Sequence, residues 1–550
     1  MTYPARVFVV GVDAATLTLI ELWVEEGMLP SFATLMERGT YGPLASVPNM
    51  NSAPAWSTFA TGQNPGKHGI FYFTRQRRED YQIDVVNATY REGHAFWRIL
   101  SDAGKRVGIV NVPISYPAEE LNGFMISGLD TPYVGCEGFT YPPGLYKELL
   151  EQVGAVEIEP GMPSFVKAGK ITEGIEKTHK TLEQRANAVE WLMATKPWDL
   201  FVVVFTAIDS VQHFFWKHMT SQADDPEILK YRDVIKQTYV KMDQVIGRLL
   251  SHLDDATIVF LVSDHGAGPS FAGTKLLPEW LIEKGFSTRR EPGSSGKSRQ
   301  LYTRAFKALY RLIDTSLTRN QKLMLAHLFP RLRRRAQSEA LFSDIDWDRT
   351  LVYLAESRNE IRLNVKGREG SGIIDPGEEY ERIRDSVMKA LLDWREPDSG
   401  QPFVKQVFRR EEVYSGKHLE DAPDILIHWD TPNVDIVRSG VDPLSYNYVT
   451  GDHQPFGTLA VCGNGVKKGA KIEEATLADI APTILCLFDV PIPIDMDGRV
   501  LLGLFESAFA KELHPEYWDA ASNSFTPIRE YDSEESELVE ERLRGLGYID

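Results

Sequence analysis

The sequence predicts an α/β fold in which a mainly parallel central sheet is flanked by helices on both faces. Short apolar runs recur along the 550-residue chain, and within each run the apolar residues are consecutive and do not alternate with polar ones. Such runs are typical of strands that are buried on both faces. Helical patterns separate the runs, which favours a sheet sandwiched between helices.

Three of the apolar runs end at an aspartate. The expected strands span residues 7–13, 106–113, 200–209, 257–266 and 458–465, and the expected helices span residues 30–39, 95–104, 185–195 and 379–394. In sheets of this kind the functional residues lie just beyond the carboxyl ends of the strands. The three aspartates are Asp13, Asp209 and Asp264, and together they predict a common polar site along one edge of the sheet.

The composition indicates a well-packed globular chain, with 43% hydrophobic residues and eleven Trp. The net charge of −18 argues against a general nucleic-acid binder, because a phosphate backbone requires a basic surface. A small phosphorylated substrate remains compatible with this charge if metal ions supply positive charge locally. No nucleic-acid polymer is therefore expected as a partner.

Cysteine usage and the first residues point to a cellular compartment. The three cysteines are far apart and odd in number, which is neither a disulfide framework nor a CxxC metal pattern. The N-terminal apolar run leads directly to Asp13, so it is a poor signal peptide and fits a first strand better. No run of about 18 apolar residues occurs, and no transmembrane helix is expected. These features predict a cytoplasmic protein.

One segment departs from the alternation of predicted strands and helices. Between Lys297 and Arg335 there are eleven Lys or Arg and one acid, Asp314. We interpret residues 276–344 as a basic helical insertion that covers the core with a solvated face; the alternative is a basic flap that contacts an anionic substrate, an anionic surface or an acidic partner. The predicted organisation is one catalytic domain made of residues 1–275 and 345–510, the insertion at 276–344, and a C-terminal tail at 511–550.

Several local patterns contain side chains suited to metal chemistry. They are Asp13 after the first strand, Ser52, the pair Asp209 and His213, the pair Asp264 and His265 in "SDHG", and His453 in "GDHQPFG". Asp209 and His213 are four residues apart and share one face if their segment is helical. Carboxylate oxygens and imidazole nitrogens suit Zn²⁺ or Mn²⁺. With the Ser52 hydroxyl these groups number seven, and they would serve two metal ions about 3.5–4 Å apart, the arrangement that clamps the attacking and leaving oxygens of a phosphoryl displacement.

Residues 51–70 contain no charged residue before Lys67, although 25% of the chain is charged. We interpret Ser52 as a nucleophile facing the metal ions, because a serine hydroxyl needs a base or a metal to become an alkoxide. Small residues allow the backbone to approach the ions, Pro54 stiffens the turn, and the hydroxyls are expected to cap a following helix. His68 is expected to support this loop.

In this order, the patterns resemble the type I phosphodiesterase and nucleotide pyrophosphatase branch of the alkaline phosphatase superfamily. The resemblance spans roughly residues 5–505 and is carried by Asp13, "SAPAWSTFATG", "PGKHGI", "AIDSVQH", "SDHG" and "GDH". It implies an alkaline-phosphatase-like fold with a helical insertion, and a hydrolase of small phosphate esters that prefers diesters.

The same resemblance implies the roles of the site residues. One metal ion would be held by Asp209, His213 and His453, and a second by Asp13, Asp264, His265 and the oxygen of Ser52. Ser52 would attack phosphorus and form a phospho-serine intermediate. The two divalent ions would be zinc, or manganese as in some branches.

The chain departs from the family pattern after the nucleophile. Nucleotide pyrophosphatases carry an Asn downstream of the nucleophile that steadies a phosphoryl oxygen, whereas this chain has aromatic residues from Phe71 to Phe73 in that region. Asn51, Thr74 and Asn111 are alternative donors. The residues that bind the substrate are therefore left open.

Other functions of the same fold remain as alternatives. Phosphomonoesterases and phosphomutases share the expected fold, and residues 64–190 contain several arginines of the kind a mutase needs to grip phosphate. Sulfatases mature a residue within C/S-x-P-x-R, and "SAPAW" matches that pattern except for Trp56 in place of Arg. A non-catalytic binding module is the remaining reading, and it is disfavoured because every expected metal ligand is present.

Overall fold

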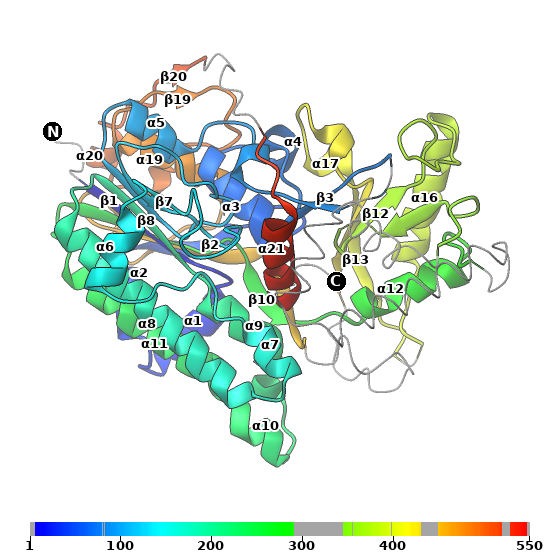
Figure 1. The fold of residues 1–550 in the computed structure, drawn as a ribbon, viewed down its shortest axis with the longest axis horizontal. Helices are drawn as coiled ribbons and strands as arrows, with labels where there is room; N and C mark the ends of the chain where they lie inside the picture. The colour runs from blue at the N-terminus through cyan, green and yellow to red at the C-terminus, as the bar shows by residue number, and fades with distance from the viewer. Residues whose placement is uncertain are drawn as a thin grey trace.

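A computed structural model describes residues 6–290, 345–430, 449–519 and 528–546, except residues 80, 82, 355 and 398. A ten-stranded sheet forms the centre of the molecule (Figure 1). Its neighbours run in the order β17 (Ala470–Lys471), β2 (Gly39–Ala45), β16 (Phe456–Cys462), β9 (Thr257–Val262), β1 (Arg6–Val12), β8 (Leu200–Phe205), β5 (Val107–Val110), β6 (Gly123–Ile126) and β7 (Thr140–Tyr141), and β18 (Ala475–Thr476) also pairs with β2.

The middle of this sheet is parallel. β9, β1, β8, β5 and β6 pair in parallel, and Val9 of β1 lies opposite both Val202 and Phe260. The strand expected at 458–465 is β16, which pairs antiparallel with both β9 and β2. The mixed but mostly parallel sheet confirms the predicted α/β class. Because β16 runs against β9, the residues that precede β16 lie at the carboxyl end of β9.

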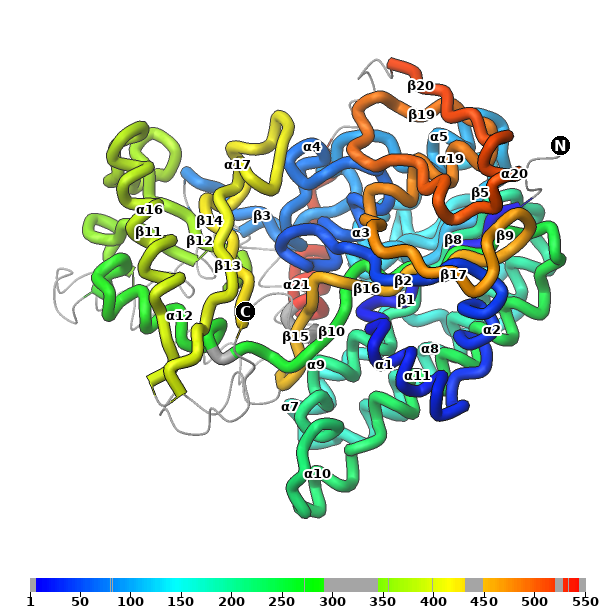
Figure 2. Tube along the Cα trace, turned by 180° about the vertical axis from the view of Figure 1, so that it is seen from behind, coloured from blue at the N-terminus to red at the C-terminus, as the bar shows by residue number. Residues whose placement is uncertain are grey.

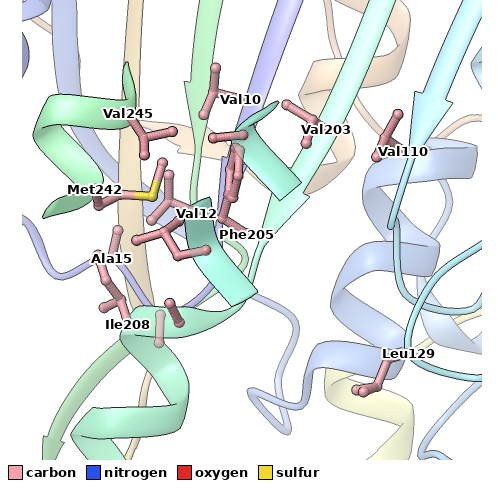
Figure 3. Close-up of a cluster of buried hydrophobic side chains, with 14 of the residues drawn as sticks. Val10, Val12, Ala15, Val110, Leu129, Val203, Phe205, Ile208, Met242 and Val245 are labelled. Atoms are coloured by element: carbon pink, nitrogen blue, oxygen red, sulfur yellow. The ribbon is translucent and has the colours of Figure 1, made fainter. Parts of the chain in front are cut away.

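Alternate residues of β1 face two different layers of helices. Phe8, Val10 and Val12 share a core with α1 (Leu17–Glu25), α2 (Pro30–Arg38), α8 (Ile171–Thr195) and α11 (Val234–Ser251). Val7 and Val9 share a core with α3 (Ser52–Thr61), α5 (Phe96–Asp102) and α19 (Ile480–Leu487). Figure 3 shows part of the first layer, with Val10 and Val12 near side chains of α11. Burial on both faces explains why the strand sequence lacks alternation.

The predicted strands run past the observed ends, by one residue in β1 and by three or four residues in β5, β8, β9 and β16. The run at 200–209 does not stay extended, because β8 ends at Phe205 and α9 (Ala207–Thr220) begins two residues later. Asp209 therefore lies in the first turn of a helix and not at a strand end. The expected helices at 30–39, 95–104 and 379–394 are confirmed as α2, α5 and α16 (Glu378–Leu392), and the expected helix at 185–195 is the last part of α8.

A second sheet lies to one side of the central one (Figure 2). It is antiparallel, with the order β11 (Val352–Leu354), β12 (Glu360–Leu363), β14 (Ile425–Trp429) and β13 (Val404–Arg409). Its own core contains residues of α12 (Ala272–Glu283) and α16, among them Leu277 and Val387. We refer to residues 271–290 and 345–430 as the lobe.

The lobe bears on the predicted domain organisation. α12 begins before the predicted insertion at 276–344, and it shares a core with strands that the sequence assigned to the catalytic domain. The basic stretch of that insertion falls in residues 291–344, which lie outside the described residues. The basic helical character and the domain boundaries at 275, 344 and 510 stay predictions.

The described part of the C-terminal tail packs onto the main body. Val539 and Leu543 of α21 (Ser533–Leu546) are fully buried in the first core layer. Arg542 donates hydrogen bonds to the carbonyl oxygens of Leu129 and Pro132, at 2.8 and 2.9 Å. Among the described residues, no helix is both long and apolar enough to cross a membrane.

Shorter elements complete the described chain. They are α4 (Pro65–His68), α6 (Leu145–Gln152), α7 (Met162–Lys167), α10 (Pro226–Tyr231), α17 (Arg410–Val413), α20 (Ser507–Ala510), β3 (Thr74–Gln76), β4 (Ile83–Val85), β10 (Gly266–Pro269), β15 (Gly451–Gln454), β19 (Ile492–Pro493), β20 (Tyr517–Trp518) and the 3₁₀ helices η1 (Ala88–Tyr90), η2 (Leu419–Asp421), η3 (Leu477–Asp479) and η4 (Leu502–Leu504). Of these, the ribbon formed by β10 and β15 matters most for the site, because it projects from the carboxyl edge of the central sheet.

Candidate active site

Two predicted carboxylates meet at the carboxyl edge of neighbouring strands. Asp13 directly follows β1, and Asp264 lies two residues after β9, its parallel neighbour. The backbone N–H of Ala14 donates to Asp264 Oδ1 at 3.3 Å, which ties the two strand ends together. Asp13 is 1% exposed and Asp264 is fully buried. Carboxylates buried side by side are costly unless a cation or a proton compensates them.

Helix α9 supplies the next two groups. Asp209 and His213 stand one turn apart on the same face of the helix, as their spacing predicts. His213 Nε2 lies 3.2 Å from Asp209 Oδ1. The helix begins just after β8, which is the neighbour of β1, and so this pair lies beside Asp13 at the same edge.

The β10–β15 ribbon brings two distant histidines together. β10 continues directly from His265, and in the antiparallel register Ala267 lies opposite His453. The rings of His265 and His453 stack with their centroids 3.8 Å apart. His453 Nε2 lies 3.1 Å from His213 Nε2 and 3.7 Å from Asp209 Oδ1. The late "GDH" pattern thus reaches the site through a strand pairing that spans almost two hundred residues of sequence.

Ser52 is the first residue of α3, and it points into this cluster. Its Oγ lies 3.0 Å from His265 Nε2, and the side chain is fully buried. The cap of the helix is the side chain of Asn51, whose Oδ1 accepts a hydrogen bond from the backbone N–H of Ala53 at 3.1 Å. The expectation that hydroxyls cap this helix is therefore wrong. The helix cap therefore does not use the serine hydroxyl.

The predicted ligands form two groups. Asp209, His213 and His453 make one, and Asp13, Asp264 and His265 make the other. Within each group the candidate ligand atoms all lie within 4.8 Å of one another. Ser52 adjoins the second group through His265. The structure thus brings all seven predicted site residues to one place.

Hydrogen bonds define which ring nitrogen of each histidine faces inward. The Nδ1 atoms of His213, His265 and His453 lie 3.2, 3.0 and 2.7 Å from the carbonyl oxygens of Gly451, Gly266 and Met50. A carbonyl oxygen only accepts, so each Nδ1 must carry the proton and donate it. Each Nε2 then presents a lone pair to the carboxylates in the neutral ring. This is the orientation that a metal-binding histidine needs.

The carboxylates show the same preference for a cation. Asp13 Oδ1 and Asp264 Oδ2 are buried and accept no hydrogen bond within the described part of the chain. Burial, followed by the charge of Asp264, raises the pKa of Asp13 well above its ordinary value. Burial also raises the pKa of Asp264. A divalent ion would relieve both effects, so the residues fit the metals that the sequence predicts.

Other residues singled out by the sequence support the site without entering the two groups. His68 Nε2 lies 3.0 Å from Thr58 Oγ1, and its Nδ1 accepts from the N–H of Ile70 at 3.1 Å, so His68 links α3 to the loop that follows α4. Of the alternative oxyanion donors, Asn111 donates its amide to the carbonyl of Val204 at 3.0 Å. Thr74 is buried in β3, and Asn51 is committed to the helix cap.

Two contributions escaped sequence reasoning. Trp56 Nε1 donates to Asp13 Oδ2 at 3.4 Å, which spans two elements that are far apart in sequence. Glu159 is bonded by the hydroxyls of Thr206 and Ser210, at 2.8 and 2.9 Å, and supports the start of α9 beside Asp209. Trp56 belongs to the pattern "SAPAWSTFATG", but its contact with Asp13, like the contacts of Glu159, is made only in the folded chain.

The solved structures to which the chain is similar include ectonucleotide pyrophosphatase/phosphodiesterases. No curated protein matches the chain. Among solved structures, an inactive variant of murine ectonucleotide pyrophosphatase/phosphodiesterase 5 in complex with AMP is 13% identical, with 91% of this chain and 100% of that chain covered and a TM-score of 0.48. The human ectonucleotide pyrophosphatase/phosphodiesterase 5 is 14% identical, with the same coverage and a TM-score of 0.46.

A family model extends over most of the chain. The model described as type I phosphodiesterase / nucleotide pyrophosphatase matches residues 7–455, a range that contains all seven site residues. Members of this family depend on divalent metal ions, and the two ligand groups are candidate sites for them. The chain therefore belongs to the type I phosphodiesterase / nucleotide pyrophosphatase family and is a phosphoric ester hydrolase.

Proposed function

We propose that this protein is a two-metal phosphodiesterase of small phosphorylated substrates, and that Ser52 is its nucleophile. The observation that carries the proposal is one buried hydroxyl beside two ligand groups: Ser52 Oγ lies 3.0 Å from His265 Nε2, and the rings of His265 and His453 stack between the groups. A serine hydroxyl that is shielded from solvent and lies beside groups able to hold metal ions can be activated as a nucleophile.

The ligand sets support two ions of the zinc class. Asp209, His213 and His453 would hold the first ion. Asp13, Asp264, His265 and the Ser52 oxygen would hold the second. Mixed nitrogen and oxygen ligands favour zinc, and manganese is the second candidate. Bound ions would supply the positive charge that lowers the pKa of the serine hydroxyl and stabilises charge on the phosphoryl oxygens.

The protein residues then perform the transfer in two displacements. Ser52 Oγ forms a bond to phosphorus while the bond from phosphorus to the leaving oxygen breaks, and the proton lost by the Ser52 hydroxyl goes to that oxygen, which departs as an alcohol. Water then attacks the phospho-serine, the bond from phosphorus to Ser52 Oγ breaks, and one proton of the water goes to Ser52 Oγ while the phosphate monoester is released. The position of Ser52 at the N-terminus of α3 favours negative charge there, because the positive end of the helix dipole lies at that terminus.

The proposal is tested by substrate class and by removal of the nucleophile. Initial rates would be measured with bis-p-nitrophenyl phosphate, p-nitrophenyl phosphate and p-nitrophenyl sulfate, each with Zn²⁺ and with Mn²⁺. The key variant is Ser52→Ala. Its matched control is Ser57→Ala, because Ser57 is equally buried in the same helix but donates to the carbonyl of Ala53 at 2.8 Å.

We expect metal-dependent diester turnover that Ser52→Ala abolishes and Ser57→Ala retains. Preference for the monoester would replace the diester proposal by a phosphatase or mutase. Turnover of the sulfate ester alone, or no turnover with both metals bound, would overturn the proposed chemistry. Equal rates in Ser52→Ala and the wild type would remove the serine from the mechanism.

A further inference from the structure

The three residues that precede the helix cap are each held by a side chain from a distant segment. His428 Nε2 donates to the carbonyl oxygen of Pro48 at 2.9 Å. Asn49 Nδ2 donates to Glu360 Oε1 at 3.0 Å. His453 Nδ1 donates to the carbonyl oxygen of Met50 at 2.7 Å. We refer to residues 48–50 as the nucleophile loop, because Asn51 and Ser52 follow it directly.

Two of these three contacts come from the lobe. Glu360 begins β12 and His428 lies on β14, and these strands pair with Glu360 opposite Leu426. Side chains alternate between the two faces of a sheet. Ile361, Ile425 and Ile427 face the lobe's own core, so Glu360 and His428 belong to the opposite face. That face is the one that contacts the nucleophile loop.

The same face also makes an apolar contact with the catalytic part of the chain. Leu426, Tyr414 and Ala422 form a small buried cluster with Phe71, and the rings of Phe71 and Tyr414 lie 5.4 Å apart, edge to face. Asn49 Nδ2 donates a second hydrogen bond, to the carbonyl oxygen of Phe71, at 2.6 Å. The lobe therefore contacts both the nucleophile loop and the segment around Phe71, and Asn49 links these two segments to each other.

The hydrogen bond between Asn49 and Glu360 is shielded from solvent. Glu360 is fully buried and Asn49 is 4% exposed. Glu360 Oε2 and Asn49 Oδ1 have no hydrogen-bond partner among the residues that the structure describes. A buried carboxyl with one unsatisfied oxygen is unfavourable for a lobe that has its own apolar core. The hydrogen bond from Asn49 offsets part of this cost, and it also orients the Asn49 side chain.

The nucleophile loop also needs external support. Met50 has a φ of 53°, a left-handed conformation that is unfavourable for a residue with a side chain. Strained residues of this kind persist when surrounding contacts over-determine them. The contacts at Pro48, Asn49 and Met50 supply that constraint directly before Ser52.

We propose that Glu360 and His428 are positioning residues, through which the lobe sets the nucleophile loop and hence the place of Ser52 Oγ between the two ligand groups. This inference rests on the proposed role of Ser52. The lobe then contributes to catalysis, because one face of its sheet holds the loop that precedes the nucleophile, although the lobe is not part of the central sheet. A misplacement of about 1 Å at a reacting atom is sufficient to reduce the rate about 10²-fold.

The test separates positioning from binding and from folding. The variants are Glu360→Ala, its conservative partner Glu360→Gln, and His428→Ala. Asn49→Ala removes the partner of Glu360 without altering the lobe, so it keeps the test valid if Glu360→Ala fails to fold. The matched control is Gln406→Ala, because Gln406 lies opposite His428 on β13 but its side chain is exposed.

We expect Glu360→Ala and Asn49→Ala to lower kcat for bis-p-nitrophenyl phosphate by about 10- to 100-fold, with KM changed by less than about threefold. Glu360→Gln should restore most of the rate, because it keeps an acceptor for Asn49. Metal content should stay at the wild-type value. A folded Glu360→Ala enzyme with wild-type kcat would overturn the inference while leaving the proposed function intact.

Hydrogen exchange supplies a second measurement that does not depend on turnover. The peptide that covers residues 46–52 should exchange faster in Glu360→Ala and His428→Ala than in the wild type and Gln406→Ala. Unchanged exchange in that peptide would also overturn the inference. If the wild type hydrolyses no diester, the proposed function fails, and the exchange data still decide whether the lobe holds the loop.

Discussion

The Nε2 atoms of His213 and His453 lie 3.1 Å apart, although the Nδ1 atom of each ring already donates to a backbone carbonyl. Two neutral imidazoles in this arrangement would direct their lone pairs toward each other and toward Asp209, so the contact requires a positive charge between the rings. Burial lowers the pKa of His453 well below its ordinary value, whereas for His213 the charge of Asp209 outweighs burial and raises the pKa to about 9. Without a metal ion a proton on His213 Nε2 bridges the two rings, and a bound metal ion would take the place of that proton.

Chelation is therefore expected to destabilise the fold. An ion that binds only the native state stabilises it by about 2.7 kcal/mol at one hundred times its Kd, and each of the two ions contributes separately. Calorimetry with EDTA, and after re-addition of Zn²⁺, measures the effect. We expect the Tm to fall with EDTA and to recover with Zn²⁺. An identical Tm in both conditions would contradict metal binding by these groups.

Loss of one ligand group should reduce the metal count from two ions to one. Asp209→Asn removes the carboxylate shared by His213 and His453. Elemental analysis of purified protein would show about one ion fewer per chain, and kcat/KM should fall about 10²-fold or more. Asp452→Asn is the control, because Asp452 adjoins His453 in sequence but belongs to neither ligand group. Two ions in Asp209→Asn would rule out this assignment.

Stability should decrease with rising pH because of Glu360. Burial, reinforced by Glu356, raises the pKa of Glu360 to about 8, and Arg362 and the Asn49 bond oppose the shift. The folded state therefore holds a proton that the unfolded chain releases near pH 4.5. The stabilising contribution is complete below pH 4.5 and is lost as the pH rises through about 8. The pKa difference corresponds to at most about 5 kcal/mol.

Urea unfolding at pH 6 and pH 9 measures this term. The wild type should lose more free energy of unfolding over this interval than Glu360→Gln, which cannot ionise. The difference between the two proteins isolates Glu360 from every other titrating group. Equal pH dependence in both would show that Glu360 is ionised in the folded protein across the whole range.

Packing between β1 and α3 should be intolerant of one added methyl group. A Cβ on Gly11 would lie 2.6 Å from Cη2 of Trp56 and 2.8 Å from Cγ2 of Val204. Gly11→Ala should cost about 1–3 kcal/mol of unfolding free energy and displace Trp56 from Asp13. Gly144→Ala is the control, because nothing lies within 4 Å of its Cβ position and its φ of −72° suits alanine.

Urea unfolding and initial rates would be measured on both glycine variants. We expect the Gly11 variant to lose activity as well as stability, since α3 carries Ser52 at its first position. A Gly11→Ala protein as stable and active as Gly144→Ala would mean that α3 shifts freely against the sheet.

Much of the fold and most of the candidate ligands could be predicted, because they follow from the types and spacing of residues that are close together in the sequence. Continuous apolar runs define strands buried on both faces, and these became β1, β5, β8, β9 and β16. A carboxylate and a histidine four residues apart share a helix face wherever that helix forms. The error at Asp209 has a physical cause: Ala207 and Ile208 are buried in α9, so the apolar pattern continues past the end of β8.

The sequence by itself determined the α/β class, the family and the identities of the candidate ligands, because residue type and spacing are local properties. Only the tertiary structure decided how those ligands meet. The pairing of β10 with β15 sets His453 against His265, and three backbone carbonyls orient the imidazole rings. The contacts of Glu360 and His428 with the nucleophile loop are of the same kind. They join segments more than three hundred residues apart, and no local pattern encodes a contact over that distance.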